Sequence, residues 1–312
     1  MSKKLRIGGA SGFWGDSVIA TPQLLNGNDL DFIVYDYLAE ITMSIMARAR
    51  AKDATKGYAV DFVSSVLKLN LRQIADQKVK ILSNAGGVNP EACAEAIREL
   101  IKELKLDLKV SVVLGDDLMT EKSKFSELNT KEMYSNEDFP AEDKIASINA
   151  YLGAFPIAEA LKSGADIVIT GRSVDSAVTL GACIYAFGWN EKEYDKLAAG
   201  SLAGHIIECG TQSTGGNFTD WELVSKDLHQ IGYPIVEVSE DGSFDCTKSK
   251  NSTGMVSFGT VAEQMLYEIG DPQAYILPDV ICDFSNVKIE ETDKDKVKIS
   301  GAKGYPAMQL AS

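Results

Sequence analysis

His205 and Glu208 stand three positions apart in the segment GHIIEC, and Cys209 follows directly. In a helix, residues at i and i+3 share one face, so this segment would bring an imidazole and a carboxylate together. Such a pair can move protons, or can hold a divalent metal together with the thiol. A buried histidine whose contacts are purely structural is the alternative. We predict His205 and Glu208 as catalytic residues.

Further charged candidates follow two apolar, strand-like segments: Asp116 and Asp117 come after the first, and Arg172 and Asp175 after the second. Asp116 can act as a base, and the adjacent pair is a weak signal for a divalent metal, which prefers oxygen ligands. The planar fork of Arg172 suits a carboxylate or a phosphate, with Asp175 beside it. The alternatives are a solvated acidic turn and a structural Arg172–Asp175 pair.

The opening segment IGGASGFWGD contains a glycine-rich turn. Gly9 and Gly12 match the last two glycines of a dinucleotide fingerprint, but Ile7 stands where the first is required. NAD(P) is therefore disfavoured, although Asp36 stands where a ribose-binding acid is expected. We predict an anion site formed by Gly9, Gly12 and Asp16 at the start of the next helix. The alternative is a tight turn whose following helix is capped by Asp16.

Two later glycine pairs extend this predicted anion-binding set. They lie in SNAGGVNP and TQSTGGNF, where glycines stand beside amide and hydroxyl side chains. We predict ligand contacts from Asn84, Gly86, Gly87, Thr214, Gly215 and Gly216. An Asx turn with Asn89 as helix cap is the alternative for the first loop, and a plain turn for the second.

The elements that must position these residues alternate between strand-like and helix-like segments. The strand-like segments are residues 4–7, 32–35, 79–82, 108–114 and 166–170. This alternation predicts an α/β fold with a Rossmann-like, mostly parallel sheet flanked by helices. Ligands in such sheets bind outside the carboxyl ends of the strands, so we expect the polar loops to gather at one edge.

The residue composition of the chain changes near residue 200. We predict a Rossmann-like part over residues 1–200 and a glycine-rich α+β part over residues 201–312, packed on the first. The polar residues 119–142 are expected to form an excursion or a lid. A strand-like segment, residues 297–300, runs into a glycine-rich turn shortly before the chain stops, and we expect an incomplete C-terminus.

Composition excludes several classes of partner. The 312 residues carry a net charge of −14, and no basic patch is visible, which argues against nucleic acid. No run of ~18 apolar residues predicts a membrane span, and no signal peptide is apparent. The five cysteines are scattered without a CxxC pair, which is typical of a reducing cytoplasm.

Longer motifs, in order along the chain, resemble those of the acyclic terpene utilisation AtuA family, formerly a domain of unknown function. They are GFWGD, DYLAEIT, SNAGGVNP, VVLGDDL, ITGRSVDSA, GHIIECGTQSTGGNF, IGYPIVEVSEDG and LYEIGDPQAYILPDVICDF. The resemblance runs from Arg6 to about Gly304. It implies a place in the bacterial breakdown of citronellol- and geraniol-type acids, where branched unsaturated acyl-CoA compounds are carboxylated, hydrated and cleaved. Some members carry an extra C-terminal domain, for which this chain has no room, and others have a small partner protein.

We therefore expect a cytoplasmic catabolic enzyme, or enzyme subunit, of lyase or hydratase type. Its substrate would be a small branched or unsaturated carboxylic acid or acyl-CoA, and its reaction a hydration, dehydration or isomerisation beside a carbonyl. An NAD(P)-dependent oxidoreductase and a non-catalytic subunit that needs a partner are the alternatives. The cofactor is left open, with a divalent metal considered, and we expect a homo-oligomer or a small partner subunit.

Overall fold

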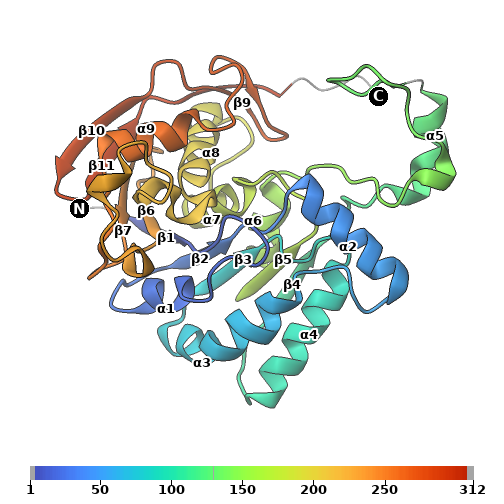
Figure 1. The fold of residues 1–312 in the computed structure, drawn as a ribbon, viewed down its shortest axis with the longest axis horizontal. Coiled ribbons are helices and arrows are strands. Elements are labelled where there is room, and N and C mark those ends of the chain that lie inside the picture. The colour runs from blue at the N-terminus through green and yellow to red at the C-terminus, as the bar shows by residue number, and fades with distance from the viewer. Residues whose placement is uncertain (1–3, 129, 308–312) are drawn as a thin grey trace.

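A nine-stranded sheet forms the centre of the molecule (Figure 1). The computed structural model describes residues 4–128 and 130–307. The strand order is β10-β11-β7-β6-β1-β2-β3-β5-β4. The strands span β1 (Leu5–Gly9), β2 (Phe32–Tyr35), β3 (Lys80–Ser83), β4 (Val110–Val113), β5 (Ile167–Thr170), β6 (Pro234–Val238), β7 (Phe244–Lys248), β10 (Lys288–Asp293) and β11 (Lys296–Ser300).

Strands β1, β2, β3, β5 and β4 run parallel, and β6, β7, β11 and β10 continue the same sheet in antiparallel pairs. The register places Ile7 of β1 opposite Phe32 of β2 on one side and Val236 of β6 on the other. The predicted α/β class is confirmed, with the five parallel strands forming the core of a mixed sheet. A second sheet, in the order β12-β9-β8, is small and antiparallel; it comprises β8 (Tyr275–Ile276), β9 (Ile281–Asp283) and β12 (Lys303–Tyr305).

Helices cover both faces of the sheet (Figure 1). On one face lie α1 (Ala20–Leu25), α2 (Glu40–Lys52), the π-helical turn η1 (Phe62–Leu67), α3 (Lys68–Gln77) and α4 (Pro90–Glu103). On the other lie α6 (Phe155–Lys162), α7 (Ala177–Phe187) and α8 (Tyr194–Glu208), and α9 (Phe258–Leu266) packs beside α8. No helix in the described part of the chain is both long and apolar enough to span a membrane.

Alternation along the strands produces these two cores. Phe32 and Val34 of β2 face α6, α7 and α8, whereas Ile33 and Tyr35 face the opposite helix layer. Successive side chains of a strand point to opposite faces, so a strand that is buried on both sides reads as an unbroken apolar run. The buried segment predicted at residues 166–170 is β5, which is buried throughout.

Two segments differ from the sequence-based expectations. The helix expected from Asp16 is only α1, which begins at Ala20; its N-cap is Ile19, with no side-chain cap, so Asp16 does not cap it. The expected excursion extends further than predicted, over residues 118–148, and we call it the arm. It contains η2 (Met119–Glu121), α5 (Lys122–Glu127) and η3 (Glu142–Lys144), and none of its described residues is buried.

Close approach of β1 to α8 makes a testable demand on Gly9. A methyl group on Gly9 would collide with the backbone oxygen of Ile207 in α8. We expect Gly9→Ala to lower the free energy of unfolding by about 2 kcal/mol, because overpacked sites force the backbone to shift. The control is Gly270→Ala, where an added methyl group meets open space and the change should stay within about 0.5 kcal/mol. Urea denaturation measures both, and equal stabilities of the two variants would contradict the packing argument.

Candidate functional site

The candidate site lies where connections leave adjacent strands on opposite faces of the sheet. Strand β3 continues into α4 on one face, and its neighbour β5 continues into α7 on the other. Such a switch point leaves a crevice outside the carboxyl ends of the strands, which is where open α/β sheets bind ligands. Asn84 follows β3 directly, and Arg172 follows β5.

Asn84 is fixed by protein at both ends of its amide. Its Nδ2 donates to Asp36 Oδ1 at 2.5 Å, and its Oδ1 accepts from the backbone N–H of Tyr37 at 2.8 Å. Asn84 and Asp36 are both buried. The amide therefore ties the end of β3 to the end of β2 and orients the Asp36 carboxyl, rather than reaching out to a ligand.

Arg172 is a buried cation held from several directions. Its Nη1 donates to Asp175 Oδ1 at 2.7 Å and to the carbonyl of Ser173 at 3.0 Å, and its guanidinium carbon lies 4.1 Å from the ring centre of Tyr151. Burial lowers the pKa of Arg172, but the Asp175 carboxylate and Tyr151 outweigh it, so the pKa is raised. The structural Arg172–Asp175 pair considered from the sequence is present.

His205 and Glu208 occupy the last turn of α8. His205 Nδ1 lies 2.7 Å from Glu208 Oε1, on one helix face as the spacing predicted, and both side chains are buried. Burial lowers the pKa of His205, but the Glu208 carboxylate and nearby backbone carbonyls raise it more, so the net shift is upward. Gln264 of α9 donates to the carbonyl of His205 at 2.8 Å. The catalytic roles of the pair stay a prediction.

Carboxylates outnumber cations in this buried region. Burial raises the pKa of Asp36 well above its ordinary value, and the negative charges of Asp175 and Glu208 raise it further. Burial and Glu208 also raise the pKa of Asp175 to about 6, although Arg172 opposes the shift. Asp36 and Asp175 therefore hold their protons to a higher pH than ordinary aspartates do.

Cys209 and the acidic pair after β4 lie at the margin of this group. Burial raises the pKa of the Cys209 thiol, which keeps it protonated and a poor nucleophile or metal ligand. Asp116 accepts from the backbone N–H of Arg172 at 2.8 Å, and burial raises its pKa, whereas Asp117 pairs with Arg50 at 3.3 Å. The two carboxylates therefore have different partners. Over residues 4–128 and 130–307, no three His, Cys, Asp or Glu side chains are grouped so as to hold a metal.

The opening glycines pack against protein. A methyl group on Gly12 would stand 2.9 Å from the backbone of Cys209, just as one on Gly9 would strike Ile207. Moreover, Asp16 Oδ2 accepts from the Gly12 N–H at 3.0 Å, so this amide is already used. The turn lets the end of α8 approach β1, and the Gly12 amide and the Asp16 carboxylate satisfy each other instead of facing an anion.

The other two glycine loops are also occupied. An added methyl group on Gly86 would strike the carbonyl of Thr170, and one on Gly87, which has a φ of 55°, would strike Met46. In the second loop, the Gly215 N–H donates to the carbonyl of Gln212 and the Gly216 N–H to that of Thr211, while Thr214 Oγ1 donates to the carbonyl of Gly232. The turn interpretation describes this loop.

Two residues of the site, both tyrosines, were not predicted from the sequence. Tyr151 lies over Arg172, and its hydroxyl bonds to Glu40. The ring centre of Tyr275 lies 6.2 Å from that of His205. Both belong to irregular or very short elements, where no periodicity marks a side chain as inward-facing. The one available signal was the family motif LYEIGDPQAYILPDVICDF, which contains Tyr275, and none of the quoted motifs contains Tyr151.

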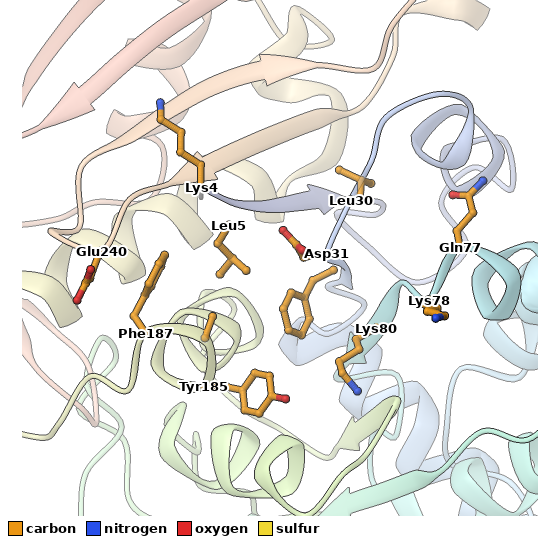
Figure 2. A pocket seen from close by; sticks show the side chains of 12 residues that line it. Lys4, Leu5, Leu30, Asp31, Gln77, Lys78, Lys80, Tyr185, Phe187 and Glu240 are labelled. Atoms are coloured by element: carbon orange, nitrogen blue, oxygen red, sulfur yellow. The ribbon is translucent and has the colours of Figure 1, made fainter. Parts of the chain in front are cut away.

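A large cavity lies at the opposite edge of the sheet, where β1, β2 and β3 begin (Figure 2). Its volume is about 650 Å³, and Lys4, Lys80 and Tyr185 are among its lining side chains. Lys4 pairs with Asp245, and Lys80 with Asp166 at 3.1 Å. Because these ammonium groups are paired and the buried acids lie elsewhere, we place the site at the carboxyl edge. A hollow of about 300 Å³ between α2 and the start of the arm opens beside that edge, next to Asn149.

Because the pKa of Asp36 is raised, we expect Asp36→Asn to stabilise the protein relative to the wild type, by an amount that increases with pH. The folded state keeps a proton that the unfolded state releases, so the wild-type protein loses stability as the pH rises above the ordinary aspartate range. The variant lacks this titration and keeps an oxygen for Asn84. We expect its melting temperature to gain on the wild type as the pH rises above about 4, the ordinary pKa of an aspartate. The exposed Asp29→Asn is the control, and a difference independent of pH would contradict the assignment.

Removing the Asn84 amide tests its bridging role. Asn84→Ala leaves the Tyr37 N–H and the Asp36 carboxyl without their partner in a buried setting. We expect the free energy of unfolding to fall by about 1–3 kcal/mol. The exposed Asn217→Ala should change it by less than about 0.5 kcal/mol. Chemical denaturation measures both, and an unchanged midpoint for Asn84→Ala would refute the bridge.

Comparison with known proteins places this geometry in a family. The family model described as acyclic terpene utilisation family protein AtuA matches residues 5–310. Because the match continues to residue 310, it gives no support to the expected shortening of the C-terminus. No curated protein and no solved structure matches the chain. The chain belongs to the acyclic terpene utilisation AtuA family.

Proposed function

We propose that this protein is a catabolic acid–base enzyme that hydrates, or in reverse dehydrates, a branched α,β-unsaturated acyl-CoA. The observation that carries the proposal is the group that buried Asp36, buried Glu208 and partly exposed Asp175 form around Arg172 at the switch point. The pKa values of Asp36 and Asp175 are raised, which brings their proton exchange closer to neutral pH than that of ordinary aspartates. The AtuA family's link to acyclic terpene utilisation supports a substrate with a branched, unsaturated carbon chain.

The charge of the site supports a thioester rather than a free acid. Arg172 is already paired with Asp175, so it is not free to clamp a substrate carboxylate. The carboxylate of a free acid would be repelled by the negative charge of the neighbouring carboxyl groups, whereas a thioester carbonyl is neutral and would not be. Two donors beside the acids, Arg172 Nε and Ser173 Oγ, are buried and have no hydrogen-bond partner among the described residues. They are suited to the oxygen of that carbonyl once Tyr151 moves aside.

In the proposed hydration, Asp175 is the base and Asp36 the acid. Asp175, with a pKa of about 6, removes a proton from water as the water oxygen bonds to the β-carbon. The electron pair of the double bond shifts toward the carbonyl, and the α-carbon then takes a proton from the protonated Asp36. Proton transfer from Asp175 to Asp36 restores the starting state, so water is added without an outside acid or base. Besides offering Nε to the carbonyl oxygen, Arg172 orients Asp175 through Nη1.

The test is turnover of a 3-methyl-2-enoyl-CoA panel, followed as loss of the conjugated thioester absorbance. We expect Asp175→Asn and Asp36→Asn to lower kcat by about 10²–10⁴-fold, the usual contribution of general acid–base groups. The rate should rise with pH through about 6 in the wild type, because Asp175 must be deprotonated, and Asp175→Asn should lose that limb. The exposed Asp76→Asn is the matched control. Full activity of Asp175→Asn, or turnover of free acids alone, would sink the proposal.

A further inference from the structure

The arm, residues 118–148, stands apart from the helix and sheet layers (Figure 1). Its two ends are joined at the body, where the Leu118 N–H donates to the Ile148 carbonyl and Asp117 bridges Asn149. Beyond this root no described residue of the arm is buried. At the tip, Met133 is 82% exposed and Tyr134 87% exposed. Apolar side chains are therefore presented to the surroundings on a projecting segment.

An arm of this kind buries too little to be stable by itself, so it needs a surface to pack against. Its helices are one or two turns long, too short to be stable without tertiary packing. Phe125 and Phe139 stack with ring centres 6.3 Å apart, which gives the arm a small internal contact. Leu128, Met133 and Tyr134 at the tip are exposed, so they bury little apolar surface to offset the conformational entropy that is lost when the chain is ordered.

The outer face of α2 offers a surface of matching chemistry. Ile41 is 69% exposed and Ile45 45% exposed, and the same helix face continues with exposed Arg48 and Lys52. These residues recur at helical spacing, so they form one stripe that is apolar at its start and basic at its end. Exposed cations are a minority on a chain of net charge −14, which makes this face distinctive.

The tip of the arm is apolar and acidic, the complement of that stripe. Lys131 pairs with Asp138 within the tip, and Glu132 accepts from the N–H of Tyr134. Glu127 and Glu137 are exposed and carry negative charge on either side of the exposed apolar residues. Opposite charges flanking apolar surfaces give an interface both its attraction and its register.

We propose that the arm tip of one copy of this chain docks on the outer face of α2 in a second copy. Tip and stripe are both exposed within one molecule, so the arm does not cover its own α2. They lie on the same side of the molecule, as Figure 1 shows for α5 and α2, and Arg50 of α2 pairs with Asp117 at the arm's root. A twofold axis between two such sides makes the contact reciprocal, with each arm on the partner's α2.

Charge exchange tests the proposal on the full chain. The wild type is expected to be a dimer by size-exclusion chromatography with light scattering. Reversal of the tip, Glu127→Lys with Glu137→Lys, and reversal of the stripe, Arg48→Glu with Lys52→Glu, should each weaken dimerisation about 100-fold or more. All four substitutions together should restore the dimer, because the opposite charges meet again.

The control carries the same charge change elsewhere: Glu103→Lys with Asp107→Lys at the exposed end of α4, which should leave the dimer intact. Circular dichroism shows that each variant is folded, and the restored four-residue variant excludes simple misfolding. A monomeric wild type overturns the proposal, as does an assembly that either reversal leaves unchanged. Failure of the combined variant to reassociate while both reversals dissociate the wild-type dimer also overturns it, since the charges would then not face each other.

Discussion

Compensation of the buried Arg172 guanidinium is the constraint on which this edge of the molecule depends. A buried cation is tolerated only when its charge and its donors are matched. Asp175 supplies the charge, the Ser173 carbonyl takes a hydrogen bond, and Tyr151 covers the guanidinium face. The backbone of Arg172 is held in turn by Asp116 from the end of β4. One residue, through its side chain and its backbone, thereby connects β5, the turn before α7, the β4 loop and the segment after the arm.

The negative charges of the acidic side chains near Arg172 are only partly compensated by cations. Asp36, Asp175 and Glu208 are opposed by Arg172 and His205 alone among the charged partners described for them. Burial first, and the neighbouring carboxylates second, raise the pKa values of Asp36 and Asp175. Retained protons at a switch point cost stability when the pH rises, and active sites are the usual place for such a cost. The same arrangement supports acid–base chemistry on a neutral substrate and argues against a free carboxylate, which refines the expectation from the sequence that Arg172 would clamp an anion.

Much of the framework was predictable because its signals are local. Residues 166–170 are typical of a buried strand since every side chain after Asp166 is apolar or β-branched up to the polar turn, and β5 is buried throughout. The i and i+3 spacing of His205 and Glu208 is a property of any helix, and the contact between them is present. Asp16 failed as a helix cap because α1 begins four residues later than the sequence suggested, after a turn that Asp16 itself closes.

Helical spacing, strand alternation and the family motifs depend only on residues that are close in the sequence. The sequence alone therefore determined the α/β class and the candidate polar loops. Tertiary structure decided what those loops do. Gly9 has no room for a side chain because Ile207, about two hundred positions away, lies against it. The pKa of the Asp36 carboxyl is raised because the fold buries it and brings Asp175 and Glu208 near it from other elements. Close packing and charge coupling act between atoms that meet only in the folded chain, and local order carries no record of which residues will meet.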